Sequence, residues 1–89
     1  MPYIREEDRE QYRAILKYIE KIGIACAGDL NYLITVLSNI YLEESGKCYT
    51  TYNEIIGVLE CAKQEYYRKK IAPYEDKKCK ENGAVWGTG

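Results

Sequence analysis

Apolar residues in the first quarter of the chain recur every three or four positions, with charged residues between them. These apolar positions are Tyr12, Ile15, Leu16, Ile19 and Ile22. Such spacing is typical of an amphipathic helix, which we predict at residues 5–22. Acidic residues in its first turn suit the positive end of the helix dipole. Gly23 is placed to end the helix, because glycine readily takes the left-handed conformation of a C-terminal cap.

A second stripe of apolar residues follows after a short interval. Its members are Leu30, Leu33, Ile34, Leu37, Ile40 and Tyr41. The spacing predicts a second helix, with Gly28 or Asp29 as the N-cap. We expect this helix to end at Ser45 and Gly46, for the same reason as the first.

The third predicted helix begins at Thr51, which forms a capping box with Glu54. Its apolar positions are Ile55, Ile56, Leu59, Ala62, Tyr66 and Ile71. Pro73 has no backbone N–H and disfavours helix at the residue before it. We therefore expect a kink there, or a break followed by a short fourth helix. Asn82 and Gly83 form a stop signal.

These elements predict an all-α protein, a small bundle of three main helices with the third long and kinked or broken at Pro73. We expect one helical domain at residues 1–83 and a C-terminal tail at residues 84–89, which includes Trp86. A chain this short buries only about 60% of its unfolded surface. Association with further copies is one way to compensate, so a homo-oligomer is expected.

Cysteine and histidine usage limits the metal sites and disulfides that the chain could form. The chain has four cysteines without a C-x-x-C pair, and no histidine, so a zinc site lacks support. The first residues do not form a secretory leader, and free thiols in a reducing compartment are expected. No apolar stretch approaches the roughly 20 residues of a membrane span. We therefore expect a cytoplasmic protein without a membrane partner, metal or cofactor.

Charge is unevenly distributed along the chain. Residues 1–62 have six basic and ten acidic residues, a net charge of −4, whereas residues 63–89 have seven basic and four acidic residues, a net charge of +3. This asymmetry indicates an anion-binding end, self-complementary subunits or simply solvated helix faces. Binding of duplex DNA is not expected, because the whole chain carries a charge of −1 and shows no helix-turn-helix spacing.

Two groups of residues are candidates for binding a ligand or a partner. Asn53 and Glu60 share a helix face with Gly57 and Gln64, where a glycine indicates close approach of a helix or a ligand. The second group combines rings that could stack on a base with cations that could hold phosphate or carboxylate. Cations there also stabilise the end of a helix without any partner. The second group consists of Tyr66, Tyr67, Arg68, Lys69, Tyr74 and Lys77.

Catalytic signatures are weak. Without histidine, serine–histidine and cysteine–histidine arrangements are excluded, and no glycine-rich phosphate loop is present. An alternative is a magnesium-dependent all-α nucleotide hydrolase that uses Glu54, Glu60 and Glu75. No adjacent acidic pair has a third acid at i+3 or i+4 on an otherwise apolar helix. Glu6 and Glu10 have the i, i+4 spacing but lie on the acidic outer face of the first helix, so no catalytic residue is predicted.

Three segments resemble a family of small bacterial and bacteriophage proteins, a domain of unknown function. They are GDLNYLIT at residues 28–35, NEIIGVLECAK at residues 53–63 and APYEDKK at residues 72–78. The resemblance covers almost the whole chain and implies a phage or mobile-element origin. It implies no catalytic residue, fold or cofactor.

The function expected from these observations is a non-enzymatic binding module that sequesters an anionic small molecule, such as a nucleotide or cyclic nucleotide, at a subunit interface. A second hypothesis is an inhibitor or adaptor of a host protein, which would use the same surface. The nucleotide hydrolase is the third.

Overall fold

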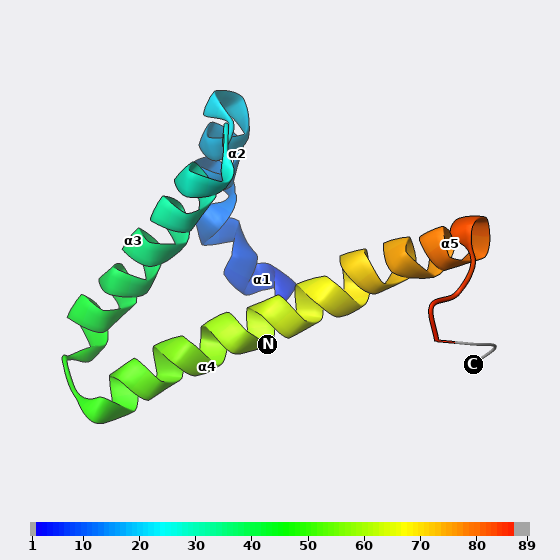
Figure 1. Ribbon diagram of the computed structural model, residues 1–89. Coiled ribbons are helices and arrows are strands. Elements are labelled where there is room, and N and C mark those ends of the chain that lie inside the picture. The colour runs from blue at the N-terminus through cyan, green and yellow to red at the C-terminus, as the bar shows by residue number, and fades with distance from the viewer. Residues whose placement is uncertain (1, 87–89) are drawn as a thin grey trace. The chain divides into compact units, whose positions relative to one another are not determined.

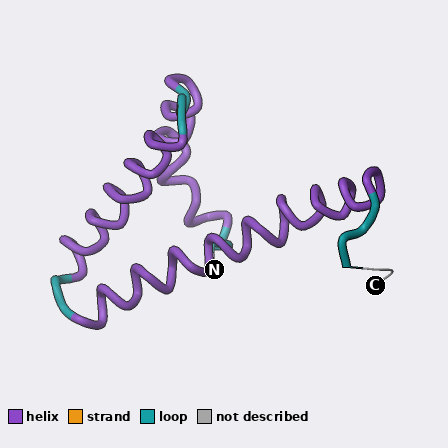
Figure 2. The backbone as a smooth tube through the Cα atoms, in the orientation of Figure 1, coloured by secondary structure: helices purple, strands orange, loops and turns teal. Residues whose placement is uncertain are grey.

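The computed structural model of the chain describes residues 2–86 and consists of helices joined by short loops (Figure 1). No strand occurs in this range, so the all-α prediction is confirmed (Figure 2). The contacts divide the chain into two compact units. We call Pro2–Ile56 the N-terminal unit and residues 57–86 the C-terminal unit. The single domain at residues 1–83 stays a prediction, and residues 87–89 of the expected tail lie outside the described range.

The first helical stretch of the N-terminal unit comprises α1 (Glu6–Arg9), a 3-10 turn (Glu10–Tyr12) and α2 (Arg13–Ile22). It matches the helix predicted at residues 5–22, although the 3-10 turn was not foreseen. Gly23 ends it as expected, with a φ of 77° and an N–H that donates to the Ile19 carbonyl at 2.7 Å. A positive φ is accessible to glycine without strain.

The second helix, α3 (Ala27–Ser45), begins earlier than predicted. Its N-cap is Cys26, which makes no side-chain capping bond but whose carbonyl accepts the Leu30 N–H at 3.2 Å. The prediction of Gly28 or Asp29 as the N-cap is therefore wrong. Cys26 has extended backbone angles, so the chain turns into the helix directly after it, and Asp29 instead lies in the first turn near the positive end of the dipole. Gly46 ends the helix as expected, with a φ of 101°.

The next helix, α4 (Tyr49–Tyr66), also begins earlier than its predicted capping box. Thr51 lies inside the first turn and is 3% exposed, with its Oγ1 3.4 Å from Cys48 Sγ. The capping box is therefore wrong, because the Tyr52 N–H already bonds to the Cys48 carbonyl at 3.1 Å. Glu54 has a different partner. Its Oε1 accepts a hydrogen bond from the Tyr41 hydroxyl at 3.1 Å, which ties α4 to α3 inside the N-terminal unit.

In the C-terminal unit α4 continues into a π-helical turn (Tyr67–Ile71) and then into α5 (Ala72–Asn82). The long third helix is thus broken into pieces, as predicted, but the disturbance precedes Pro73. Proline offers no N–H, and its ring crowds the carbonyl four residues earlier, that of Lys69. A wider π turn accommodates both effects. The separate fourth helix is not confirmed, because α5 follows the π turn without a loop. Gly83 ends α5 with a φ of 92°.

Little of this helical surface is buried. Within residues 2–86, Leu42 at 9% exposure is the one buried apolar residue, and Thr51 is the one buried polar residue. The apolar stripes predicted from the sequence lie where expected on their helices, but most of their residues are exposed. None of the helices in the described range combines the length and apolar character needed to cross a membrane.

Candidate functional site

Six of the eight predicted site residues lie on one continuous helical segment of the C-terminal unit, which we call the basic-aromatic segment (residues 66–78). Tyr66 is the last residue of α4, the π turn contributes Tyr67, Arg68 and Lys69, and α5 contributes Tyr74 and Lys77. Within residues 66–74 the sequence has three cations and no acid. The widened backbone therefore presents a local positive charge in a chain whose net charge is −1.

Arg68 is already engaged by a neighbour. Its Nη2 lies 2.7 Å from Glu65 Oε1, and the Glu65 side chain is 20% exposed. A pair at this exposure contributes little to stability, because water screens it. Arginine has five N–H donors, so a single contact through Nη2 does not use up the guanidinium. Arg68 is thus oriented by Glu65 and still able to bind an anion.

Tyr67 is fixed across the π turn by Glu75. The Tyr67 hydroxyl donates a hydrogen bond to Glu75 Oε1. This bond, together with the negative charge of Glu75, raises the pKa of Tyr67, because ionisation would lose the bond and place two negative charges side by side. The expected role of Tyr67 as a ligand contact is therefore limited to its ring, since its hydroxyl is occupied.

The remaining ring and cations of the segment are more accessible. Lys78 Nζ lies 5.7 Å from the centroid of the Tyr74 ring and 3.2 Å from Glu81 Oε2. In contrast, Lys69, Lys70 and Lys77 make no ion pair within residues 2–86. These three ammonium groups are the cations best suited to an incoming anion.

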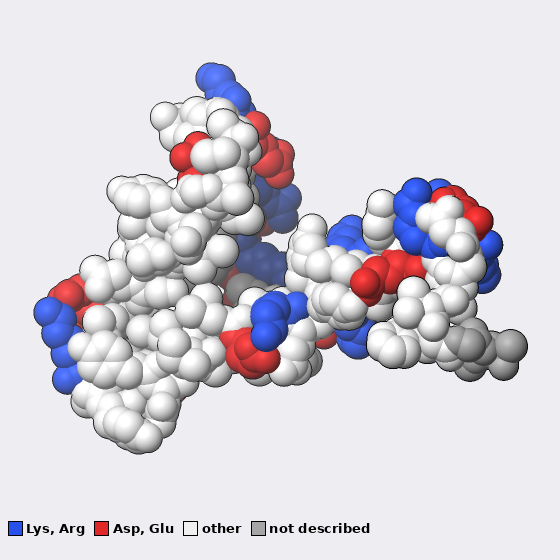
Figure 3. All heavy atoms as spheres, in the orientation of Figure 1, with Lys and Arg blue, Asp and Glu red and all other residues white. Residues whose placement is uncertain are grey.

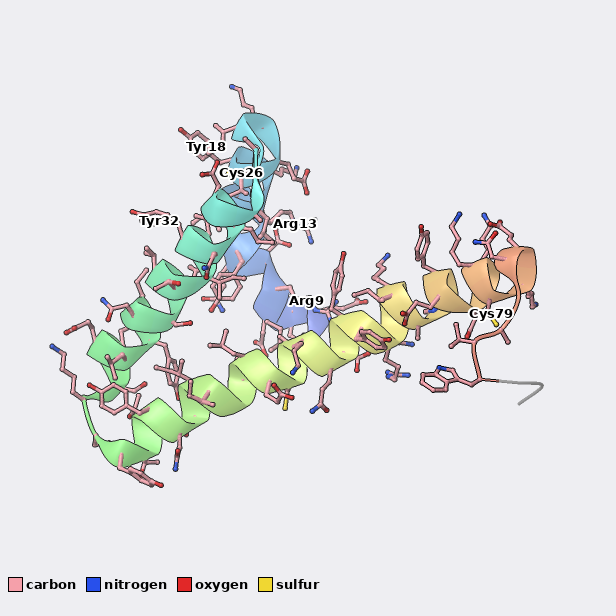
Figure 4. All side chains as sticks on the ribbon, in the orientation of Figure 1. Arg9, Arg13, Tyr18, Cys26, Tyr32 and Cys79 are labelled. Atoms are coloured by element: carbon pink, nitrogen blue, oxygen red, sulfur yellow. The ribbon has the colours of Figure 1, made fainter. Side chains whose placement is uncertain are left out.

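An open groove of about 580 Å³ lies beside this segment, within the C-terminal unit. It includes side chains of both charges, so it is not a purely anionic or cationic site. Trp86 lies at the groove and is 90% exposed. The view with side chains shows Cys79, another lining residue, on α5 (Figure 4). The lining residues are Tyr67, Glu75, Asp76, Lys78, Cys79, Asn82, Gly83, Ala84, Val85 and Trp86.

The two other predicted site residues do not join the basic-aromatic segment. Asn53 belongs to the N-terminal unit and Glu60 to the C-terminal unit. Glu60 is paired with Lys63 at 3.0 Å and accepts from Gln64 Nε2 at 3.1 Å. Both bonds lower the pKa of Glu60, the one to Lys63 more strongly. A general base at neutral pH needs a raised pKa, so Glu60 is poorly suited to that role.

The helix crossing suggested by Gly57 is not found in the described chain. A Cβ built on Gly57 would meet no atom within 4 Å. The glycine therefore lies on open surface, and nothing within residues 2–86 explains why the chain tolerates its cost of about 1 kcal/mol relative to alanine.

The carboxylates of the hydrolase hypothesis are each engaged elsewhere. Glu54 accepts from Tyr41, Glu75 from Tyr67, and Glu60 from Lys63 and Gln64. Over residues 2–86, no group of three or more cysteine or acidic side chains is arranged to hold a metal ion. The four cysteines are unpaired and exposed. Nothing in this geometry favours the hydrolase.

The N-terminal unit has an exposed, uncharged surface on α3 that was not predicted from the sequence. From Leu30 to Leu42, α3 has no charged residue, and the surface above it is almost uniformly uncharged (Figure 3). Most of its apolar side chains are nonetheless exposed, including Tyr32 at 68% and Leu37 at 59%. The signal that could have found this surface is the length of the uncharged run, which exceeds what one buried helix face requires.

Comparison with known proteins identifies the family but no relative of known activity. The chain belongs to the family described as Domain of unknown function (DUF6899), whose model matches residues 1–85. No curated protein matches the chain, and no solved structure does.

Proposed function

We propose that the protein is a non-enzymatic binding module whose basic-aromatic segment holds an anionic small molecule, such as a nucleotide or cyclic nucleotide, in an assembly of several copies. The observation that supports this proposal is the acid-free stretch at residues 66–74, in which three consecutive cations occupy the π turn between exposed tyrosines. The same proposal includes a phage or mobile-element origin, which the resemblance implies. It also includes a location in the cytosol of a bacterial host.

The chemistry of the segment suits a phosphate attached to a flat ring. The Arg68 guanidinium matches two phosphate oxygens, while Lys69 and Lys70 act as flexible point charges. Tyr66 and Tyr74 are 61% and 59% exposed, and exposed rings of this kind stack on nucleobases of any sequence. Together these groups favour nucleotides over inorganic anions.

A second candidate function is inhibition of a host protein. The groove beside α5, together with the exposed Trp86, favours this alternative. Tryptophan is enriched among the residues that dominate protein–protein binding energy. This function would need a partner that covers the indole.

A thermal-shift and calorimetry experiment tests the first function. The probes are ATP, a cyclic dinucleotide and inorganic phosphate, each titrated into the full chain. A nucleotide present at 100 times its Kd stabilises the folded protein by about 2.7 kcal/mol. We expect this stabilisation with one of the nucleotides, and none with phosphate.

Matched variants locate the site. The double variant Lys69→Gln with Lys70→Gln should weaken nucleotide binding at least about tenfold, equivalent to roughly 1.4 kcal/mol. The control is Lys17→Gln with Lys21→Gln, which removes the same charge from α2 and should leave binding unchanged. Equal loss in both variants would show that only net charge matters. The absence of any nucleotide shift, together with burial of Trp86 by a captured protein, would favour the second function.

A further inference from the structure

We call α2, α3 and the loop between them the α2–α3 hairpin. The apolar residues of α3, and those of the helical stretch that ends with α2, have a spacing that is characteristic of paired helices. In α3, Leu30, Leu33, Leu37 and Ile40 follow one another at intervals of three, four and three residues. Helices with this spacing place all such residues on one seam, where they interlock with a neighbouring helix. The α3 seam therefore has the pattern of a contact between helices.

The first helical stretch repeats the same spacing. Its seam is Tyr12, Ile15, Ile19 and Ile22, again at intervals of three, four and three residues. Only Ile19 is half-buried, whereas Ile15 is 55% and Ile22 is 65% exposed. The hairpin loop at residues 23–26 joins this seam to that of α3, and Figure 1 shows the two helices diverging from the loop. Each hairpin thus has two apolar seams and does not close them against each other.

The N-terminal unit lacks a core of its own. Of the residues in Pro2–Ile56, only Leu42 and Thr51 are buried. A unit with so little buried apolar surface cannot offset the conformational entropy lost on folding. Whatever covers the two seams must therefore be present whenever this unit folds.

The exposed apolar side chains of the hairpin form a surface suited to a subunit interface. On α3, Leu30 is 47%, Leu37 is 59% and Ile40 is 49% exposed, and on the first helical stretch Tyr12 is 49% exposed. Apolar side chains exposed along two consecutive helices mark a site of protein–protein interaction.

From these observations we infer that the α2–α3 hairpin is a self-association surface, and that its two apolar seams are covered by the same hairpin of a second copy of this chain. Two hairpins supply four helices, and four helices around a shared apolar centre form a stable bundle. The proposed function includes an assembly of several copies, and this inference names the surface through which those copies associate. It involves the N-terminal unit and leaves the anion site of the C-terminal unit untouched.

A second copy fits the hairpin better than a foreign protein does. Identical seams have identical spacing and length, so the same surface is complementary to itself about a two-fold axis, the commonest symmetry of soluble assemblies. The uncharged run from Leu30 to Leu42 offers no charge pattern that would select another partner. A copy is also present wherever the chain is synthesised, which satisfies the requirement for a constant partner.

The test compares two variants of α3 that add the same charge. Leu37→Glu places a carboxylate on the seam, while Asn39→Glu, half a helical turn away on the polar side, is the matched control. Sedimentation should show an assembly of two or more copies for the unmodified chain and for Asn39→Glu. The Leu37→Glu variant should dissociate at least about tenfold more readily, the equivalent of a tenfold change in Kd.

Two measurements on the unmodified chain keep the inference testable if Leu37→Glu fails to fold. The midpoint of thermal unfolding should rise with protein concentration, as it does when folding and association are coupled. Copies with two different tags, mixed and refolded, should be recovered together. A monomer with a concentration-independent midpoint would overturn the inference, and would show that the C-terminal unit or another part of the same chain covers the seams. Intact assembly without nucleotide binding would leave this inference standing while the anion site fails.

Discussion

Helices α3 and α5 are both exposed to solvent, but the chemistry of their exposed surfaces differs. In α5, six of the 11 residues are charged, and ions such as Lys78 and Glu81 pair along the helix at 3.2 Å. In α3 the run from Leu30 to Leu42 has no charge at all. Water solvates α5 at no great cost, whereas the exposed apolar surface of α3 is unfavourable in water. The comparison supports the proposals that the N-terminal unit associates with a second copy and that the C-terminal unit binds an anionic small molecule.

The largest expected difference between the two units comes from truncating one apolar side chain in each. Ile40→Ala on the α3 seam should lower the free energy of unfolding by about 2–5 kcal/mol, because the proposed assembly covers this side chain. Val58→Ala on α4 should change it by no more than about 0.5 kcal/mol, as is usual for exposed positions. Urea unfolding of both variants measures the difference. Equal, small effects would contradict the assignment of α3 to an interface.

Pro73 provides the next largest expected effect, and it concerns the C-terminal unit. Pro73→Ala restores an N–H that can bond to the Lys69 carbonyl, so the π turn should become regular helix. We expect a gain of about 1–3 kcal/mol in stability, accompanied by weaker nucleotide binding because Tyr67 and Lys69 change position. Circular dichroism and calorimetry on the same sample measure both.

Pro2→Ala, outside any helix, is the control for this substitution. If Pro73→Ala gained stability and bound nucleotide unchanged, the π turn would have no part in the site.

Much of the helical architecture could be predicted from sequence periodicity. Glycines at positions 23, 46 and 83 end the helices because a positive φ suits glycine, and each of these ends was predicted correctly. Helix starts were less predictable. Cys26 and Thr51 show why: a local capping motif competes with the backbone bonds that an earlier start gains, and the sequence does not reveal which is stronger.

The candidate site was predictable only in part. The positions of Arg68 and Lys69 follow directly from the chain, but their partners do not. The bond from Tyr67 to Glu75 spans eight residues and depends on the widened π turn, which no spacing rule anticipates. The exposure of the α3 seam was equally hidden, because periodicity shows which residues share a face but not whether the same chain covers them.

Substitution of Gly57 should have a smaller effect on stability, and the sign of that effect is informative. If its surface is open, as the chain alone shows, Gly57→Ala should stabilise the protein by about 1 kcal/mol through helix propensity. If a helix of another copy approaches there, the added methyl should instead weaken the assembly. Thermal unfolding at two concentrations separates these outcomes. Gly28→Ala, where the nearest side-chain atom lies at 3.7 Å, is the matched control.

The smallest expected effect is the pH dependence of Tyr67. Its folded pKa is raised by Glu75 above the usual value of 10.0. The stabilisation from this bond is therefore complete below about pH 10 and is lost as the pH rises through the folded pKa. The absorbance titration of the full chain minus that of Tyr67→Phe isolates this tyrosine. Glu75→Gln should return its pKa toward the usual value, and an unchanged titration would show that the hydrogen bond is absent in solution.

Hydrogen–deuterium exchange of the intact chain, resolved by peptide, tests the contrast between α3 and α5 most directly. If the α3 seam is covered by a second copy, amides at residues 30–42 should be the slowest to exchange, and dilution should accelerate them. Amides at residues 72–82 should exchange faster and at a rate independent of protein concentration. Equally rapid exchange in both segments at high concentration would contradict the account, because α3 would then lie open to water in solution as α5 does.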